Sequence, residues 1–208
     1  MASTYVNDLR LTELGTGDGS GTWGTTTNTN LELIGEALGF GAEATFDTDA
    51  NKTTTVANGA SDPARGMYFK VTSTVTDGLT ATRQLTIAPD TINRLMFIEN
   101  ATTGGESITI KQGSGAGAAV TIPNGDTKAV ILPGSGSGSI VLDAFASLSV
   151  VDLKVQDDLT VTDDAAIGGL ATVGGTLGVT GIATFTDDII IGNGKTIGSA
   201  SDVDAMSI

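Results

Sequence analysis

The sequence predicts an all-β protein made of three consecutive parts, and three observations predict this fold class. The 29 glycines and the many threonines among the 208 residues favour short strands and tight turns. The middle of the chain alternates apolar and polar residues, as half-buried strands do. The last part repeats every six residues. We therefore expect an N-terminal segment with one short helix (1–43), an antiparallel β-sandwich or jelly-roll-like domain (44–147) and a hexad-repeat shaft (148–208).

The shaft is predicted by six-residue repeats that run from Leu153 to Ala200 without an insertion. The first position of a repeat is mostly apolar, the third is always apolar and the fifth is always a turn former. Positions one and three of a strand point to the same face, and the turn former then redirects the chain. Each repeat is therefore expected to form a short strand and a corner, and stacked repeats form one apolar row. The third-position residues are Val155, Val161, Ile167, Val173, Val179, Phe185, Ile191 and Ile197.

A single apolar row is too narrow to be buried by its own chain, and two closures are open. Three chains can wind together as a β-helix or β-prism, so that their rows meet on a common axis. Alternatively, one chain can coil as a left-handed β-helix, but the run of repeats is short for that. Such a coil also normally has one large aliphatic residue in each repeat, whereas two are present here. We expect a homotrimer whose core consists of the third-position residues.

The middle part predicts about seven short strands in an antiparallel sandwich. Residues 67–75 place apolar side chains at alternate positions, and Asp-Gly at 77–78 predicts a hairpin to a returning strand at 85–87. Residues 95–98 are all apolar and predict a central strand buried on both faces. Asn-Gly at 124–125 predicts a second hairpin.

The first part predicts a short helix over 31–38, with Asn30 as its N-cap and Gly39 after its end. A helix of this length is not stable alone, so it must pack on its own sandwich or on another protein. A glycine-rich loop at 18–24 precedes it and carries the only tryptophan. The apolar side chains of this part that are available for packing or docking are Trp23, Leu31, Ile34 and Leu38.

Composition argues against several function classes. The 24 acidic and 10 basic residues give a formal charge of −14, which repels nucleic acid and anionic membrane surfaces. Cysteine and histidine are absent, so thiolate metal sites, imidazole bases and histidine-dependent triads are excluded. No secretory segment or long apolar run is visible in the sequence. We expect no enzymatic activity, no cofactor, no metal and no membrane insertion.

Clusters of acidic residues are the candidates for a calcium site or a catalytic carboxylate pair. Residues 47–51 resemble the start of a calcium loop but lack its glycine and its final glutamate, which favours a solvated turn. Paired aspartates recur at repeat corners, at 157–158, 163–164 and 187–188. They could collect calcium or act as a carboxylate pair, but a solvated corner that discourages sideways aggregation is the favoured interpretation.

Taken in order, the segments resemble a known family of virion proteins. They are GTWGTTTNTNLELIGEALG at 21–39, RQLTIAP at 83–89, FIENATTGGESITIK at 97–111, VTIPNGDTKAVIL at 120–132 and the LTVTDD-type repeats. This series resembles the amino-terminal, tail-attached part of tail fibres and related virion proteins of bacteriophages that infect marine bacteria.

The resemblance implies a homotrimer in the tail of a virion, made in the host cytoplasm. Residues 1–43 would attach to a tail protein of the adaptor or nozzle type through Trp23, Leu31, Ile34 and Leu38. Residues 44–147 would be a collar or spacer, and the repeats would begin a longer shaft that projects for host attachment. A host receptor would be contacted only by more distal parts.

Three other classes of protein are alternatives to this expectation. A trimeric bacterial surface adhesin stalk would carry similar repeats. A hexapeptide-repeat acyltransferase would normally need a histidine base, which this sequence lacks. A capsid decoration or tail tube protein would not be expected to contain the long run of repeats.

Overall fold

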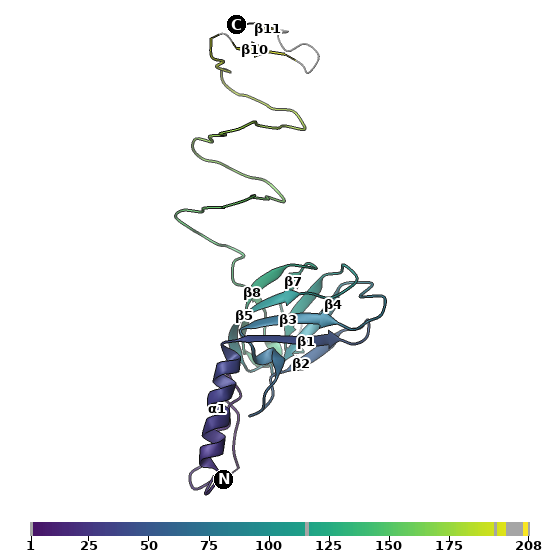
Figure 1. Ribbon diagram of the computed structural model, residues 1–208, viewed down its shortest axis with the longest axis vertical. Helices are drawn as coiled ribbons and strands as arrows, with labels where there is room; N and C mark the ends of the chain where they lie inside the picture. Colours follow the sequence, from purple (N-terminus) through teal and green to yellow (C-terminus); the bar gives the residue numbers. More distant parts are fainter. Residues whose placement is uncertain (1, 115–116, 194, 199–205, 208) are drawn as a thin grey trace. The chain divides into compact units, whose positions relative to one another are not determined.

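The computed structural model describes residues 2–114, 117–193, 195–198 and 206–207 (Figure 1). The chain divides into two compact units, Met1–Asp152 (unit 1) and Leu153–Ile208 (unit 2). The described residues form strands, turns and a single α-helix, which confirms the mainly β class. The segments predicted as an N-terminal part and a sandwich lie together in unit 1, and strand β1 crosses the expected boundary at residue 43.

Unit 1 contains the helix α1 (Trp23–Ala37) and two β-sheets that face each other. Sheet A, in spatial order, consists of β1 (Phe40–Phe46), β3 (Tyr68–Ser73), β5 (Asn93–Asn100), β8 (Thr127–Pro133) and β9 (Leu142–Asp143). Sheet B consists of β2 (Lys52–Thr55), β4 (Arg83–Ala88), β6 (Ile108–Gln112) and β7 (Val120–Ile122). Short 3-10 helices occur at η1 (Pro63–Arg65) and η2 (Gly136–Gly138).

Successive strands up to β6 alternate between the two sheets, so that the chain winds as a coil. As a result β1, β3 and β5 pair in parallel in sheet A, and β2, β4 and β6 pair in parallel in sheet B. Only the later strands reverse direction: β7 pairs antiparallel with β6, β8 with β5, and β9 with β8. The predicted antiparallel sandwich is therefore wrong in strand direction.

The two predicted hairpins are wrong for the same reason, because each turn carries the chain from one sheet to the other. The turn at 77–78 links β3 to β4, and the turn at 124–125 links β7 to β8. The turn chemistry itself is as expected, since Gly78 and Gly125 have φ values of +76° and +83°. Gly78 also stacks on the next coil, where an added Cβ would lie 2.5 Å from the backbone nitrogen of Gly104.

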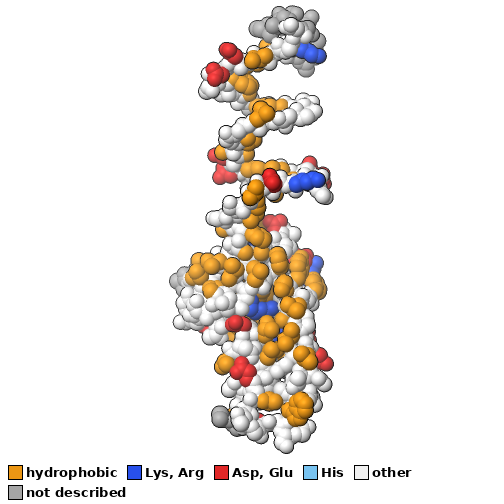
Figure 2. Space-filling model, turned by 90° about the vertical axis from the view of Figure 1, so that its left-hand side faces the viewer, with side chains coloured by type: hydrophobic (Ala, Val, Ile, Leu, Met, Phe, Trp, Pro, Cys, Tyr) orange, Lys and Arg blue, Asp and Glu red, His pale blue; other side chains and the backbone are white. Residues whose placement is uncertain are grey.

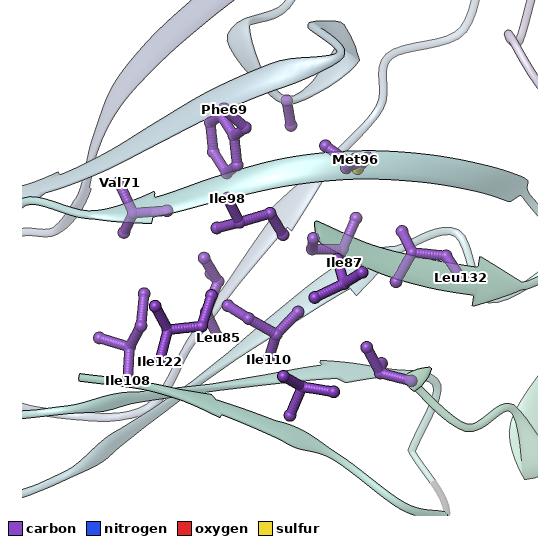
Figure 3. Packing of buried hydrophobic residues seen from close by; sticks show 14 of the residues in the cluster. Phe69, Val71, Leu85, Ile87, Met96, Ile98, Ile108, Ile110, Ile122 and Leu132 are labelled. Atoms are coloured by element: carbon purple, nitrogen blue, oxygen red, sulfur yellow. The ribbon is translucent and has the colours of Figure 1, made fainter. Parts of the chain in front are cut away.

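The space between the sheets is a continuous apolar core (Figure 3). Phe69, Met96 and Ile98 point into it from sheet A, and Ile87 and Ile110 point into it from sheet B (Figure 3). Burying one strand face against the opposite sheet removes more apolar surface from water than pairing the same strand edge to edge. Strands of either sheet therefore contribute to this core.

Buried amide side chains satisfy backbone groups at the margins of this core. Gln112 donates a hydrogen bond to the carbonyl of Ile92 (2.8 Å) and accepts one from Ser139 (2.6 Å). Asn100 donates to the carbonyls of Glu106 and Ile122, each at 3.0 Å. Gln112 also accepts a hydrogen bond from the backbone nitrogen of Gly134 (3.0 Å), so the two amides satisfy main-chain groups that turns would otherwise leave unpaired inside the protein.

Helix α1 is longer than predicted and begins eight residues before Leu31, at Trp23. The prediction that Asn30 caps it is wrong. The Asn30 side chain instead accepts a hydrogen bond from the backbone nitrogen of Thr12 (3.0 Å) and donates one to its carbonyl (2.9 Å). The amide therefore binds a neighbouring segment as a strand partner would, a long-range contact that local sequence rules do not detect. Leu33 and Ala37 are the buried residues of the helix.

Unit 2 is an open coil over the repeats (Figure 1). Residues 153–193 form no strand, while β10 (Thr196–Ile197) pairs antiparallel with β11 (Met206–Ser207). The short strand expected in each repeat is therefore absent from the single chain at 153–193. A strand needs a neighbouring backbone to pair with, and successive turns of this coil do not supply one. The described repeats accordingly lack the paired turns that a single-chain β-helix would require.

The core predicts that substitutions at two neighbouring residues of β6 change the free energy of unfolding by very different amounts. Ile110 is fully buried between the sheets, whereas Thr109 lies on the outer face and contacts the hydroxyl of Thr121. Ile110→Ala should lower the free energy of unfolding by about 2–5 kcal/mol. Thr109→Ala should change it by about 0.5 kcal/mol or less. Urea denaturation followed by circular dichroism measures both, and equal losses would contradict the two-sheet core.

Candidate assembly surfaces

The candidate docking residues of the N-terminal part lie together on an exposed face of α1 and its C-terminal end. Trp23, Leu31, Ile34 and Leu38 are all exposed. In an α-helix, positions separated by 8, 11 and 15 residues fall on one side, so these side chains form a single stripe. The structure brings the four predicted residues together, and their binding to a tail protein stays a prediction.

An apolar hollow of about 220 Å³ adjoins this stripe between α1 and sheet A. Ile34 and Leu38 of the helix region form one side, and Met67 and Leu95 form another. Leu9 of the N-terminal segment also lines it. The exposed apolar surface of the helix therefore continues onto the sheet.

Sequence reasoning missed the outer face of sheet A, which carries two apolar rows. One row contains Phe40, Tyr68 and Phe97, which are opposite one another in β1, β3 and β5. The rings of Phe40 and Tyr68 stack with centroids 5.7 Å apart. The second row contains Leu95, Ile131 and Leu142 of β5, β8 and β9.

The strand at 95–98 was predicted to be central and buried on both faces, and only the first part is correct. Strand β5 lies in the middle of sheet A, but Leu95 is 48% exposed. Figure 2 looks from the left of Figure 1, where α1 and β5 are labelled, and shows hydrophobic side chains gathered on this side of unit 1. The signal in the sequence was the all-apolar run itself, which does not distinguish burial in one chain from burial between chains.

Paired charges border the apolar rows of sheet A. The ammonium group of Lys70 lies 2.8 Å from Glu99, whose other oxygen accepts a hydrogen bond from the Tyr68 hydroxyl (2.9 Å). The Lys70 contact holds the pKa of Glu99 below its ordinary value, and Glu99 in turn raises the pKa of Lys70. Both groups therefore stay charged at neutral pH and cancel each other on this face.

The outer face of sheet B is polar instead. Its cross-strand rows combine threonines with Gln84 and Lys111, and Thr109 contacts Thr121 across β6 and β7. A hollow of about 380 Å³ on this face is lined by polar side chains that include Gln84, Thr86 and Asp90. The two outer faces of unit 1 thus differ in chemistry, with apolar rows on sheet A and hydroxyl-rich rows on sheet B.

A buried guanidinium group binds the N-terminal segment to the loop before η1 and lies near α1. Arg65 is 0% exposed and donates hydrogen bonds to the carbonyls of Leu9, Ala57 (2.6 Å) and Ala60 (2.8 Å). It forms an ion pair with Asp62 (3.1 Å) and lies 3.9 Å from a carboxylate oxygen of Glu36 in the helix. Burial raises the pKa of Asp62, which the positive charge of Arg65 opposes. We assign this cluster a structural role.

Asp47 and Asp49, which belong to the calcium-loop-like segment at 47–51, bind protein groups. Asp49 accepts hydrogen bonds from Arg83 (2.7 Å) and Thr80 (2.5 Å), and these contacts, led by Arg83, lower the pKa of Asp49. Asp47 pairs with Lys52, which lowers its pKa as well. Within the described ranges, no group of three or more acidic residues is arranged to hold a metal ion.

The third-position residues of the repeats are accessible in the single chain. Among them, all but Ile191 are exposed, with fractions between 41% for Ile197 and 65% for Ile167. First-position residues such as Leu153, Leu159 and Leu177 are exposed as well. Figure 2 shows hydrophobic side chains recurring along the coil of unit 2. The row is present in the order that the sequence predicts, and this chain by itself does not cover it.

Comparisons with known proteins assign no family to this chain: no protein-family model, no curated protein and no solved structure matches it. Within the part of the chain that the structure describes, helices lack the length and apolar character needed to cross a membrane.

Because the guanidinium group of Arg65 is buried, its removal is expected to destabilise unit 1 strongly. Arg65→Met leaves the carbonyls of Leu9, Ala57 and Ala60 without their donor and leaves Asp62 buried without its cation. The free energy of unfolding should fall by about 3–5 kcal/mol, and urea denaturation measures it.

Arg10→Met is the matched control, because Arg10 binds Asn58 (2.9 Å) at an exposed site. Limited proteolysis should also cut the N-terminal segment faster in Arg65→Met than in Arg10→Met. Indistinguishable stability of the two variants would show that Arg65 does not anchor this segment.

Proposed function

We propose that this protein is a structural component of a phage virion, the tail-proximal part of a homotrimeric tail fibre. In this proposal α1 attaches the chain to a tail protein and unit 1 forms a collar. The repeats of unit 2 wind with those of two other chains into the start of a shaft for host attachment. The function is mechanical, and catalysis has no part in it.

The exposed apolar row of unit 2 is the observation that carries the proposal. Leaving a regular series of valine and isoleucine side chains in water is unfavourable, by up to about 1.5–3 kcal/mol for each side chain that could be fully buried. Threefold winding brings the rows of three chains onto one axis and gives each short strand a backbone partner. The open coil of the described repeats is compatible with this closure, because it leaves both the apolar row and the backbone free to pair.

The exposed stripe on α1 supports attachment through the N-terminal part. Large exposed apolar patches with an aromatic residue are typical of protein interfaces. Trp23 and Leu38 at the two ends of the stripe are the strongest candidates, because both are large and well exposed. The assignment of the partner as a tail protein rests on the resemblance of the sequence to tail fibres.

A trimeric bacterial surface adhesin stalk is the second candidate, since its repeats would satisfy the same physical requirement. A capsid decoration or tail tube protein agrees less well, because it gives the apolar row of unit 2 no role. Trimer formation is common to the first two candidates, so the location of the protein must separate them.

The trimer is tested by light scattering on the purified chain. We expect a mass about three times the 20.8 kDa of one chain, and loss of the trimer in Val179→Asp, which places an unpaired charge in the shared row. In one chain Val179 is half exposed, so this substitution should leave a monomer folded. Thr180→Asp adds the same charge at the next position, which is expected to face away, and should remain trimeric. Trimers from both variants, or a monomeric native chain, would refute the interchain row.

The location is tested with an antibody raised against residues 1–152 and applied to particles from the producing host. We expect electron microscopy to show label at the tail, where the fibres join it. Label on the capsid surface would favour a decoration protein. Label on the surface of uninfected cells would favour the adhesin stalk.

A further inference from the structure

We propose that the outer face of sheet A is a second contact surface between copies of this chain, so that the trimer begins in unit 1 before the repeats. This inference rests on the proposed homotrimer and adds a specific interface to it. The surface consists of the two apolar rows defined above, with Leu95 and Phe97 of β5 at its centre.

The chemistry of this face is that of a protein interface. Its centre is apolar, with Phe40, Tyr68 and Phe97 in one row and Leu95 and Leu142 in the other. Its border carries the Lys70–Glu99 ion pair. An apolar centre with a polar border is the usual anatomy of such contacts, and the two opposite charges add no net charge to the face.

Charge favours contact between copies of the chain at this face over contact at other parts of their surfaces. The chain carries a formal charge of −14, so copies repel one another at most orientations. The outer face of sheet A is a region where Lys70 neutralises Glu99 and where the central residues are uncharged. Three copies can turn this face toward a common axis without placing unpaired like charges opposite each other.

Continuity along the chain identifies the occupant as a further copy. Strand β9, at the edge of sheet A, is the last strand of unit 1. The segment that follows it exposes Phe145, Leu148, Val150 and Val151, and Val151 is 100% exposed. Exposed apolar residues therefore continue in sequence from Leu142 of the sheet to the first repeat at Leu153. A partner that covered only sheet A would leave this segment and the repeats in water. Association with further copies can cover the outer face of sheet A, residues 145–151 and the repeats.

The length of the connection makes the contact accessible once the repeats have joined. Ten residue steps separate Asp143 from Leu153, and an extended chain spans at most about 3.3–3.6 Å per residue. Three copies held together at their repeats therefore keep their β9 strands within about 35 Å of the repeat starts. Tethering at this range corresponds to an effective concentration of about millimolar, which is enough for a modest apolar face to associate.

Thiol labelling tests the contact, because the chain has no cysteine of its own. Leu95→Cys and Leu142→Cys place a thiol on the outer face of sheet A, and Thr121→Cys places one on the exposed face of sheet B. Each full-length variant is first weighed by light scattering. Its labelling rate by a maleimide is then divided by the rate in the urea-unfolded chain, which removes differences in intrinsic reactivity.

In trimers we expect Leu95→Cys and Leu142→Cys to react on the order of tenfold more slowly than Thr121→Cys, because a covered thiol is not accessible to the reagent. Two variants on one face guard against the misfolding of either. Trimers in which the sheet A thiols react as fast as Thr121→Cys would overturn this inference and leave the proposed trimer intact. The same result combined with protection on assembled virions would assign the face to a tail protein. A monomeric native chain would refute both proposals.

Discussion

The strands of unit 1 need to bury one apolar face each, and the two facing sheets meet this requirement. The chain crosses the core after each strand until it reaches β6, and neighbouring strands in each sheet are therefore parallel up to that point. Buried Gln112 and Asn100 then bind the backbone groups that the crossings would leave unpaired. The antiparallel strands β7, β8 and β9 end the coil by reversing against its last strands.

The same constraint is not met in unit 2. Its repeats carry an apolar row of the kind that forms the core of unit 1, but one chain offers no second layer to cover it. The outer face of sheet A and the stripe on α1 are in the same position, since both expose large apolar side chains. A chain with three such surfaces and a charge of −14 on the remainder is suited to ordered assembly with few partners.

Polar contacts hold the parts of unit 1 that its core does not include. Helix α1 buries only Leu33 and Ala37, so apolar burial alone contributes little to its attachment. Arg65 binds the N-terminal segment and the loop before η1, and its Nε lies 3.9 Å from a carboxylate oxygen of Glu36 in the helix. This side chain is charged and has no surface exposure.

The sequence by itself determined the period of the repeats, the apolar row at their third positions, the mainly β class and the presence of a helix that contains Leu31 and Ile34, whereas it placed Trp23 in a loop before that helix. These features are local, because they depend on the spacing of side chains along one strand or helix. Only the tertiary structure decided the direction of strand pairing, the role of Asn30 and the burial of Arg65. Each of these depends on which distant segments meet across the core. The exposure of Leu95 was also decided there, because an apolar run is compatible with burial in one chain or between chains, and only the neighbours present in space distinguish the two.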